Sequence, residues 1–203
     1  MGYTKYSIDG LKQWLKDNLT QDRYEHSLGT AQCAQELAIK YNSNPDKAYI
    51  AGLIHDCAKC FPKENLLKII ETYLDIDSSE KMNYKTWHAP VSSYIAKETF
   101  GIEDAEILSA IRWHTLGRQD MTTFEKIIFL ADKIETKTRE AQYVKSIRNL
   151  LEQENGLNKA ILECYKLTIK SLVDRDLKIC PVTIEIYNSF EEMISHKNQQ
   201  KII

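Results

Sequence analysis

The chain has 203 residues, with 27 Lys and Arg against 29 Asp and Glu, and a formal net charge of −2. The length suits one domain with a sizeable core, and the charge lacks the basic excess of a nucleic-acid-binding surface, so we expect no nucleic-acid partner. No apolar run approaches the roughly 18 to 20 residues that span a bilayer, and no apolar signal region opens the chain, so we expect no membrane association. The five cysteines are odd in number and sparse, which argues against a disulfide scaffold, so we expect a reducing cytoplasm.

The hydrophobic periodicity is helical almost throughout, without a convincing alternating strand, and predicts an all-α fold. In chain order, the first predicted helix starts after Ser7 or Asp9 and the second runs from about Gln21 to Tyr41. Further helices are predicted to start at Pro45, at Pro62 and at Pro90, one contains Ile107 and Ile111, and the next starts after Thr122. The last three cover about 143–152, 156–173 and 181–195.

Two helix starts carry specific capping signals. Asn44 followed by Pro45 has the pattern of an N-cap residue and a proline in the first helical position. Thr122 and Glu125 have the spacing of a capping box. The chain contains no linker-like stretch, repeat or low-complexity tract, so we expect one domain over residues 1–203.

Two possible chemical signatures overlap in residues 52–62, a His55-Asp56 pair and a Cys57-x-x-Cys60 motif. A redox dithiol is typical of a thioredoxin-like βαβ unit, which a helical chain does not offer. A structural zinc site usually needs a second ligand pair, and the other three cysteines stand alone in the sequence. We therefore interpret Cys57 and Cys60 as small side chains near the core without a catalytic role.

Histidine and aspartate give the stronger signal, because four of the five histidines and two aspartates fall on inward faces of different predicted helices. A single histidine on such a face is more often a hydrogen-bonded core residue than a ligand, but convergence of several weakens that interpretation. A carboxylate at the edge of a core is costly unless it is paired or binds a metal. Imidazole and carboxylate ligands suit iron, manganese, zinc or cobalt rather than calcium. The candidate residues are His26, His55, Asp56, His88, His114 and Asp132.

Basic residues accompany these candidates at helical spacing. Arg23 lies one turn before His26, Lys59 lies three residues after Asp56, and Arg139 lies two turns after Asp132. Each residue taken alone is as consistent with a solvated surface charge or a helix salt bridge as with a contact to a substrate. Together they indicate an anionic substrate, for which phosphate is the first choice.

The order His26, His55-Asp56 and Asp132 resembles that of the HD phosphohydrolase superfamily. The segments around it are similar to one branch, the bacterial symmetrical diadenosine tetraphosphate hydrolases, or YqeK-like proteins. The similar segments are RYEHSLGTAQCAQELA, KAYIAGLIHDCAK, HAPVSSYIA, AIRWHTLGRQDMT and KIIFLADKIET. The chain departs from the family pattern at Cys57, Ala89, Lys133 and Thr136, and none of these is an expected metal ligand.

The resemblance implies an all-helical HD-domain bundle with a metal-binding core over about 20–140, C-terminal helices over about 143–195 and a polar tail over 196–203. It also implies a homodimer and one or two ions of iron, or of manganese, zinc or cobalt. The implied metal ligands are His26, His55, Asp56 and Asp132. The implied substrate-binding residues are Arg23, Lys59, His88, His114, Thr115 and Arg139, with a segment near Arg175–Cys180 against the nucleoside. The catalytic residues would be Asp56, Lys59, His88 and His114.

The expected reaction is metal-dependent hydrolysis of diadenosine tetraphosphate into two ADP. Whether His88 and His114 bind a second metal or the phosphate stays open at this stage. One alternative is an HD enzyme of another specificity, a 5′-nucleotidase or a deoxynucleotide triphosphohydrolase. The other is a nucleotide-binding regulatory module without catalysis, which is disfavoured because every expected ligand position is occupied.

Overall fold

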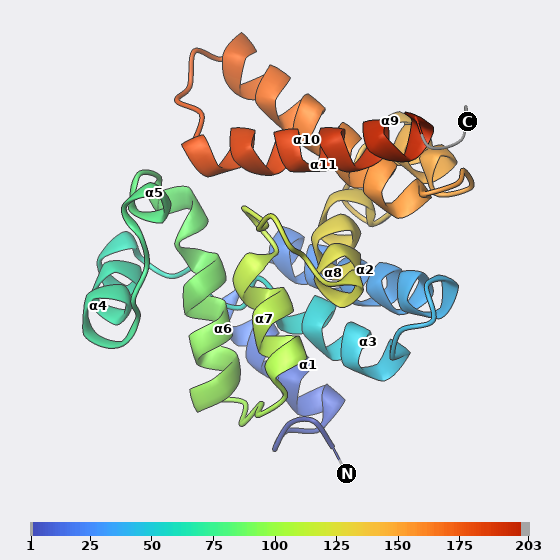
Figure 1. Ribbon diagram of the computed structural model, residues 1–203. Helices are drawn as coiled ribbons and strands as arrows, with labels where there is room; N and C mark the ends of the chain where they lie inside the picture. Colours follow the sequence, from blue (N-terminus) through green and yellow to red (C-terminus); the bar gives the residue numbers. More distant parts are fainter. Residues whose placement is uncertain (1, 200–203) are drawn as a thin grey trace.

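The computed structural model describes residues 2–199, except for the side chains of residue 79 and residues 196–199, and is helical as expected (Figure 1). No strand occurs within these described residues. The helices are α1 Ile8–Asn18, α2 Gln21–Lys40, α3 Pro45–Ile54, α4 Lys63–Tyr73, α5 Ser78–Lys81, the 3-10 helix η1 Tyr84–Thr86, α6 His88–Glu98, α7 Ala105–Trp113, α8 Thr123–Ile134, α9 Ala141–Leu150, α10 Gly156–Asp174 and α11 Pro181–Gln199.

Helix α2 is the centre of the fold and packs most extensively against α3 and α8. Gly52 of α3 permits the close approach of α2, because a Cβ atom at this position would lie 2.9 Å from the Thr30 carbonyl oxygen. The same approach brings His55, three residues further along the chain, next to the inner face of α2. The packing that builds the core thus also places the first histidines side by side.

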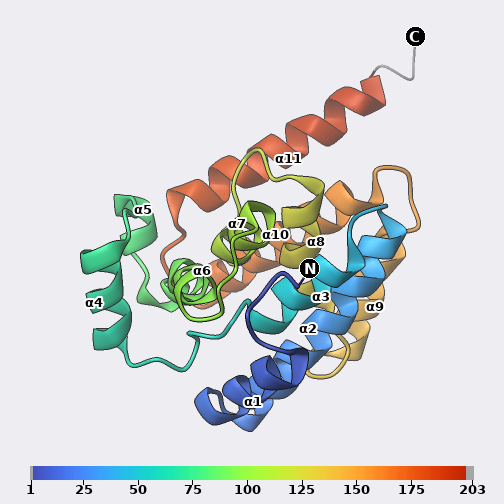
Figure 2. The same ribbon diagram turned by 90° about the horizontal axis from the view of Figure 1, so that it is seen from below.

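The remaining helices surround this centre (Figures 1 and 2). Helices α6 and α7 pack on each other and α7 packs on α3 and α8, whereas α4 covers α6 over a smaller apolar cluster of its own. Helices α10 and α11 form a long hairpin that lies across one end of the bundle, above α7 and α8 in the view of Figure 1. Figure 2, seen from below, shows α5 at the side of the bundle next to α4.

The predicted capping signals are confirmed. The Asn44 side chain accepts from the backbone of Asp46 and Lys47, and Thr122 and Glu125 form the reciprocal capping box of α8. Such caps satisfy backbone N–H groups that lack partners in the first turn.

The helices differ from the predictions in several places. Helix α6 begins at His88 rather than Pro90, because the first-turn backbone groups need no intrahelical acceptor and tolerate a proline. Helix α5 and the 3-10 helix η1 were not predicted, since four and three residues are too few to show a periodicity. Helix α11 continues to Gln199, past the predicted end at residue 195. Of the predicted polar tail, residues 200–203 lie outside the described residues.

No helix within the described residues is both long and apolar enough to cross a membrane. The division into one domain over the whole chain stays a prediction, which a single cooperative unfolding transition would test.

Candidate metal centre

Four histidines from four different elements meet at one buried point. His26 comes from the second turn of α2, His55 follows the end of α3, His88 opens α6 and His114 follows the end of α7. Each is at most 2% exposed. The His55 and His114 rings meet edge to face at 4.8 Å between centroids. Helices that are distant in sequence thus deliver imidazole rings to one place.

Three of these rings are held by backbone carbonyl groups. The Nδ1 atoms of His55 and His114 lie 2.7 Å from the carbonyl oxygens of Gly52 and Ile111, three residues earlier in each case. His88 Nδ1 lies 2.9 Å from the Lys85 carbonyl oxygen. A carbonyl oxygen can only accept, so Nδ1 carries the proton in each ring. The Nε2 atoms of the three rings therefore face the centre of the cluster.

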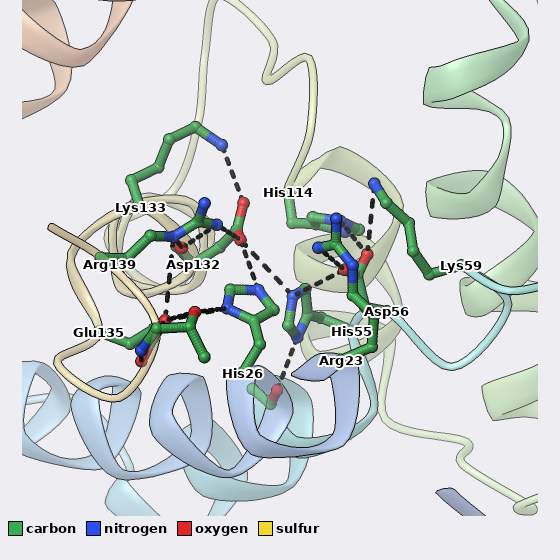
Figure 3. A network of polar contacts seen from close by, with 12 residues as sticks. Arg23, His26, His55, Asp56, Lys59, His114, Asp132, Lys133, Glu135 and Arg139 are labelled. Carbon is green, nitrogen blue, oxygen red and sulfur yellow. Dashed lines mark hydrogen bonds and ion pairs between the residues drawn. The ribbon is translucent and has the colours of Figure 1, made fainter. Parts of the chain in front are cut away.

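His26 is held differently, by a carboxylate. Its Nδ1 lies 3.1 Å from Glu135 Oε1 and its Nε2 lies 2.9 Å from Asp132 Oδ1, as Figure 3 shows. The Glu135 side chain is fully buried and also accepts from the backbone N–H groups of Lys137 and Thr138. A carboxylate behind a ligating imidazole fixes its orientation and raises its basicity.

Asp56 lies between the two sides of the cluster and faces the Nε2 atoms of three histidines. Its Oδ1 is 3.0 Å from His88 Nε2 and 3.4 Å from His114 Nε2, and its Oδ2 is 3.8 Å from His55 Nε2. Despite these short distances, Asp56 Oδ1 and His55 Nε2 have no hydrogen-bond partner, and both atoms are buried.

These orphaned acceptors fit a divalent metal ion. Two groups of three buried side chains offer ligand atoms within 4.8 Å of one another, and both groups include Asp56. One group adds His26 and His55 and the other adds His88 and His114. A cation placed in either group would satisfy the unpartnered Asp56 Oδ1, and nitrogen and oxygen donors suit a transition metal. The cluster thus has the ligands for a metal centre, and the identity of the ion is a separate question.

The charges in the cluster shift the pKa values of its members. Burial alone would raise the pKa of Asp56 and of Asp132, but the histidines around both, and Lys133 beside Asp132, outweigh it and hold both pKa values well below the ordinary one. Burial lowers the pKa of His114 to about 4. Burial also acts to lower the pKa of His26, but its hydrogen bonds to Asp132 and Glu135 outweigh burial and raise it. The two carboxylates are therefore ionised at neutral pH, as metal ligands must be.

The predicted basic residues lie around the cluster. Arg23 Nη1 is 3.5 Å from Asp56 Oδ2, and Arg139 binds both the carbonyl oxygen and, at 2.9 Å, Oδ1 of Asp132. Lys59 Nζ lies 3.0 Å from His88 Nε2, where it can donate to the lone pair, and burial lowers its pKa. Figure 3 shows these side chains pointing toward the two aspartates from both sides.

A cavity of about 450 Å³ opens beside the cluster. Thr115 belongs to both, because its Oγ1 is 2.9 Å from His114 Nε2 and the residue lines the cavity wall. Apolar side chains such as Phe129, Leu172 and Leu177 also line it. The predicted segment Arg175–Cys180 contributes Arg175, Leu177, Lys178 and Cys180 to the same wall.

The structure thus brings together every predicted site residue. Two contributing residues are not among the predicted site residues. Glu135 lies three residues after Asp132, and this spacing puts it one turn away on the same face. Lys133, which lies 2.9 Å from Asp132 Oδ2 and lines the cavity, was not selected. Its position next to an expected ligand and its departure from the family pattern were the available signals.

The two cysteines of the Cys-x-x-Cys motif point to different environments. Cys57 is fully buried with its Sγ 3.7 Å from the Ser92 carbonyl oxygen, whereas Cys60 is exposed, and both are free thiols. Burial raises the pKa of the Cys57 thiol to about 12, which makes it unreactive. The geometry agrees with the interpretation that the motif is not a redox pair.

Comparison with known proteins decides the family. Residues 23–137, which include every predicted metal ligand but not Arg139, match the family described as HD domain. The chain belongs to the HD domain family. The predicted resemblance to this superfamily and the predicted all-α fold are therefore confirmed.

Relatives within the family are similar over most of their length. The chain is 38% identical over 181 residues to a Bacillus subtilis protein named symmetrical bis(5′-nucleosyl)-tetraphosphatase, covering 86% of this chain and 92% of that protein. A Staphylococcus aureus protein of the same name is 34% identical over 184 residues, with 91% and 94% covered. The crystal structure of a Clostridium acetobutylicum protein, described as a predicted HD superfamily hydrolase involved in NAD metabolism, has a TM-score of 0.86 at 37% identity and covers 93% of this chain and 98% of that one.

Proposed function

We propose that this HD-domain protein is a metal-dependent hydrolase that cleaves diadenosine tetraphosphate symmetrically into two ADP. The observation that carries the proposal is Asp56, a buried carboxylate shared by two groups of histidines, in a cluster that Thr115 joins to a cavity of about 450 Å³. The names of the Bacillus and Staphylococcus relatives support the same reaction.

The proposed metal ligands are His26, His55, Asp56 and Asp132, with iron as the first choice and manganese, zinc or cobalt as alternatives. A divalent ion supplies Lewis-acid activation of water and of a phosphoryl oxygen. The low pKa values of both aspartates and the free Nε2 of His55 suit this role.

The chain's own basic groups would bind and orient the phosphates. Lys59 and Arg23 lie on one side of Asp56, and Arg139 lies behind Asp132. Placed there, they offset the negative charge that develops on the phosphoryl oxygens in the transition state. The Thr115 hydroxyl lies at the entrance to the cavity and can donate to a phosphate oxygen.

His88 and His114 are proposed as catalytic residues that direct Nε2 into the cluster, because their Nδ1 atoms donate to carbonyl oxygens. His88 Nε2 also lies 3.0 Å from Lys59 Nζ, and His114 Nε2 lies 2.9 Å from Thr115 Oγ1. A second cation, where bound, would be held by Asp56, His88 and His114 and would supply further Lewis-acid activation.

The cavity would hold one nucleoside with its phosphates. Its lining includes apolar side chains, which suit a base, and the four cations Lys85, Lys133, Arg175 and Lys178. No aspartate or glutamate is among the described residues that line it. A protein of net charge −2 with such a wall offers a local site for an anion.

Product analysis tests the proposal. We expect metal-loaded protein incubated with diadenosine tetraphosphate to yield ADP alone on ion-exchange chromatography. Equal amounts of AMP and ATP would reject symmetrical cleavage. Faster hydrolysis of a nucleoside monophosphate or a deoxynucleoside triphosphate would favour the alternative HD specificities, and nucleotide binding by inactive, fully metallated protein would favour the regulatory module.

A homodimer in the cytoplasm completes the proposal, on the ground of the family resemblance. Light scattering of the purified protein would test the first part and cell fractionation the second.

A further inference from the structure

Lys133 lies between the metal centre and the cavity. It follows Asp132 in α8, and its Nζ is 2.9 Å from Asp132 Oδ2 and 4.5 Å from the centroid of the Phe129 ring. Its side chain is 20% exposed and lines the cavity. Figure 3 shows the side chain arching over α8, with its ammonium group above the Asp132 carboxylate.

Among the cations of the cavity wall, Lys133 has a special position. The others are Lys85, Arg175 and Lys178, and of the four only the Lys133 side chain has a contact with the cluster among the described interactions. Thr115 joins the cluster to the cavity from the opposite element, the segment after α7. A phosphate chain that runs from the histidines into the cavity would thus pass Thr115 and Lys133.

We propose that Lys133 is a substrate-binding residue that contacts the phosphate next to the nucleoside held in the cavity. This inference rests on the proposed function and names the part of the nucleotide that the residue recognises. The ammonium group has three donors, and the Asp132 contact uses one of them. The Phe129 face below it keeps the charge at the cavity wall, where an anion can reach it.

The competing explanation is that Lys133 only neutralises Asp132. In that case its loss would leave a less compensated carboxylate in the cluster and change the affinity for the metal. Its loss would then have no separate effect on the nucleotide. The two roles therefore predict different measurements on the same variant.

The test compares the Lys133→Met protein with wild type and with Lys126→Met as a control. Lys126 lies on α8 two turns earlier and packs over Phe190, outside the cavity lining, so its replacement removes the same charge from the same helix. Binding of ADP and of adenosine is measured by calorimetry on metal-loaded protein, and metal content is measured by elemental analysis.

We expect Lys133→Met to weaken ADP binding about tenfold or more, because a hydrogen bond between charged groups is lost. Adenosine binding and metal content should stay within twofold of wild type, and Lys126→Met should change neither ligand's affinity. Lys133→Arg, which retains the charge, should recover part of the ADP affinity. With diadenosine tetraphosphate, Lys133→Met should raise KM more than it lowers kcat.

Unchanged ADP affinity in Lys133→Met would overturn the inference, as would an equal loss for adenosine or a loss of metal. Absence of ADP binding by the wild-type protein would overturn it as well. Failure of the proposed function is a separate result, since a wild-type protein that binds ADP but does not split diadenosine tetraphosphate still reports the role of Lys133.

Discussion

The two halves of the metal centre are built from different chemistry. The half formed by α2 and α8 has His26 between two carboxylates, Asp132 and Glu135. The half formed by the ends of α6 and α7 has His88 and His114, each backed by a neutral carbonyl oxygen. Asp56 belongs to both halves.

This difference implies that the two halves have different functions, one in metal retention and one in catalysis. Carboxylates behind and beside an imidazole concentrate negative charge, which favours firm retention of a cation. Carbonyl-backed rings next to Lys59 and Thr115 form a less negative region that faces the cavity. We therefore expect the α2–α8 half to hold its metal tightly and the α6–α7 half to act on the substrate.

Loss of the shared residue should have the largest effect. We expect Asp56→Ala to abolish metal retention in both halves and to lower kcat/KM by at least about 10³-fold, because both ligand groups lose their common carboxylate. Elemental analysis and steady-state kinetics measure the two effects. Retention of a full metal complement by this variant would show that the halves do not share Asp56.

Replacement of His114 should separate catalysis from metal retention. We expect His114→Gln to lower kcat by about 10²-fold, a size typical of losing one preorganised group in an active site. At least one metal ion per chain should remain, whereas the matched His26→Gln protein should lose that ion. Loss of all metal from His114→Gln would contradict the division between the halves.

The buried carboxylate behind His26 should affect the metal and not the chemistry. Glu135→Gln keeps the shape but removes the charge, and we expect metal affinity to fall about 10- to 100-fold. At saturating metal kcat should be close to that of wild type. Glu25→Gln, an exposed carboxylate paired with Lys137, is the control and should leave metal affinity unchanged. An equal change in both variants would remove any special role of Glu135.

The cysteines Cys57 and Cys60 follow Asp56 in the sequence but belong to neither half, and their replacement should give the smallest effect. We expect the double replacement Cys57→Ser and Cys60→Ser to leave kcat/KM within about twofold, since surface and near-isosteric changes are usually mild. In the native protein a thiol reagent at pH 8 should modify Cys60 and spare Cys57, whose pKa burial raises to about 12. Loss of most of the turnover would show that the Cys-x-x-Cys motif is functional.

Much of this architecture follows from local sequence signals. The caps at Asn44 and Thr122 fixed two helix starts, because side-chain and backbone partners lie within three residues. The histidines and aspartates could be named as candidates because each falls on the inward face of its predicted helix. Their convergence was implied by the family resemblance and by no single spacing.

Other features depend on tertiary contacts that no local pattern contains. The pairing of Glu135 with His26 joins residues 109 positions apart. It also depends on Gly29, since a Cβ atom there would overlap the Glu135 carboxylate. The Nδ1 bonds that set the histidine tautomers depend on ring orientation. Lys133 acquires its role only because α10 and α11 close the cavity beside it.

Hydrolysis of diadenosine tetraphosphate in ¹⁸O-labelled water tests the central claim most directly, because it reports which phosphorus atom the water attacks. The account predicts ADP as the sole nucleotide product, with label on the β-phosphate of one ADP from each substrate molecule. Mass spectrometry measures this distribution. Label in AMP or in the γ-phosphate of ATP would contradict symmetrical cleavage at this metal centre.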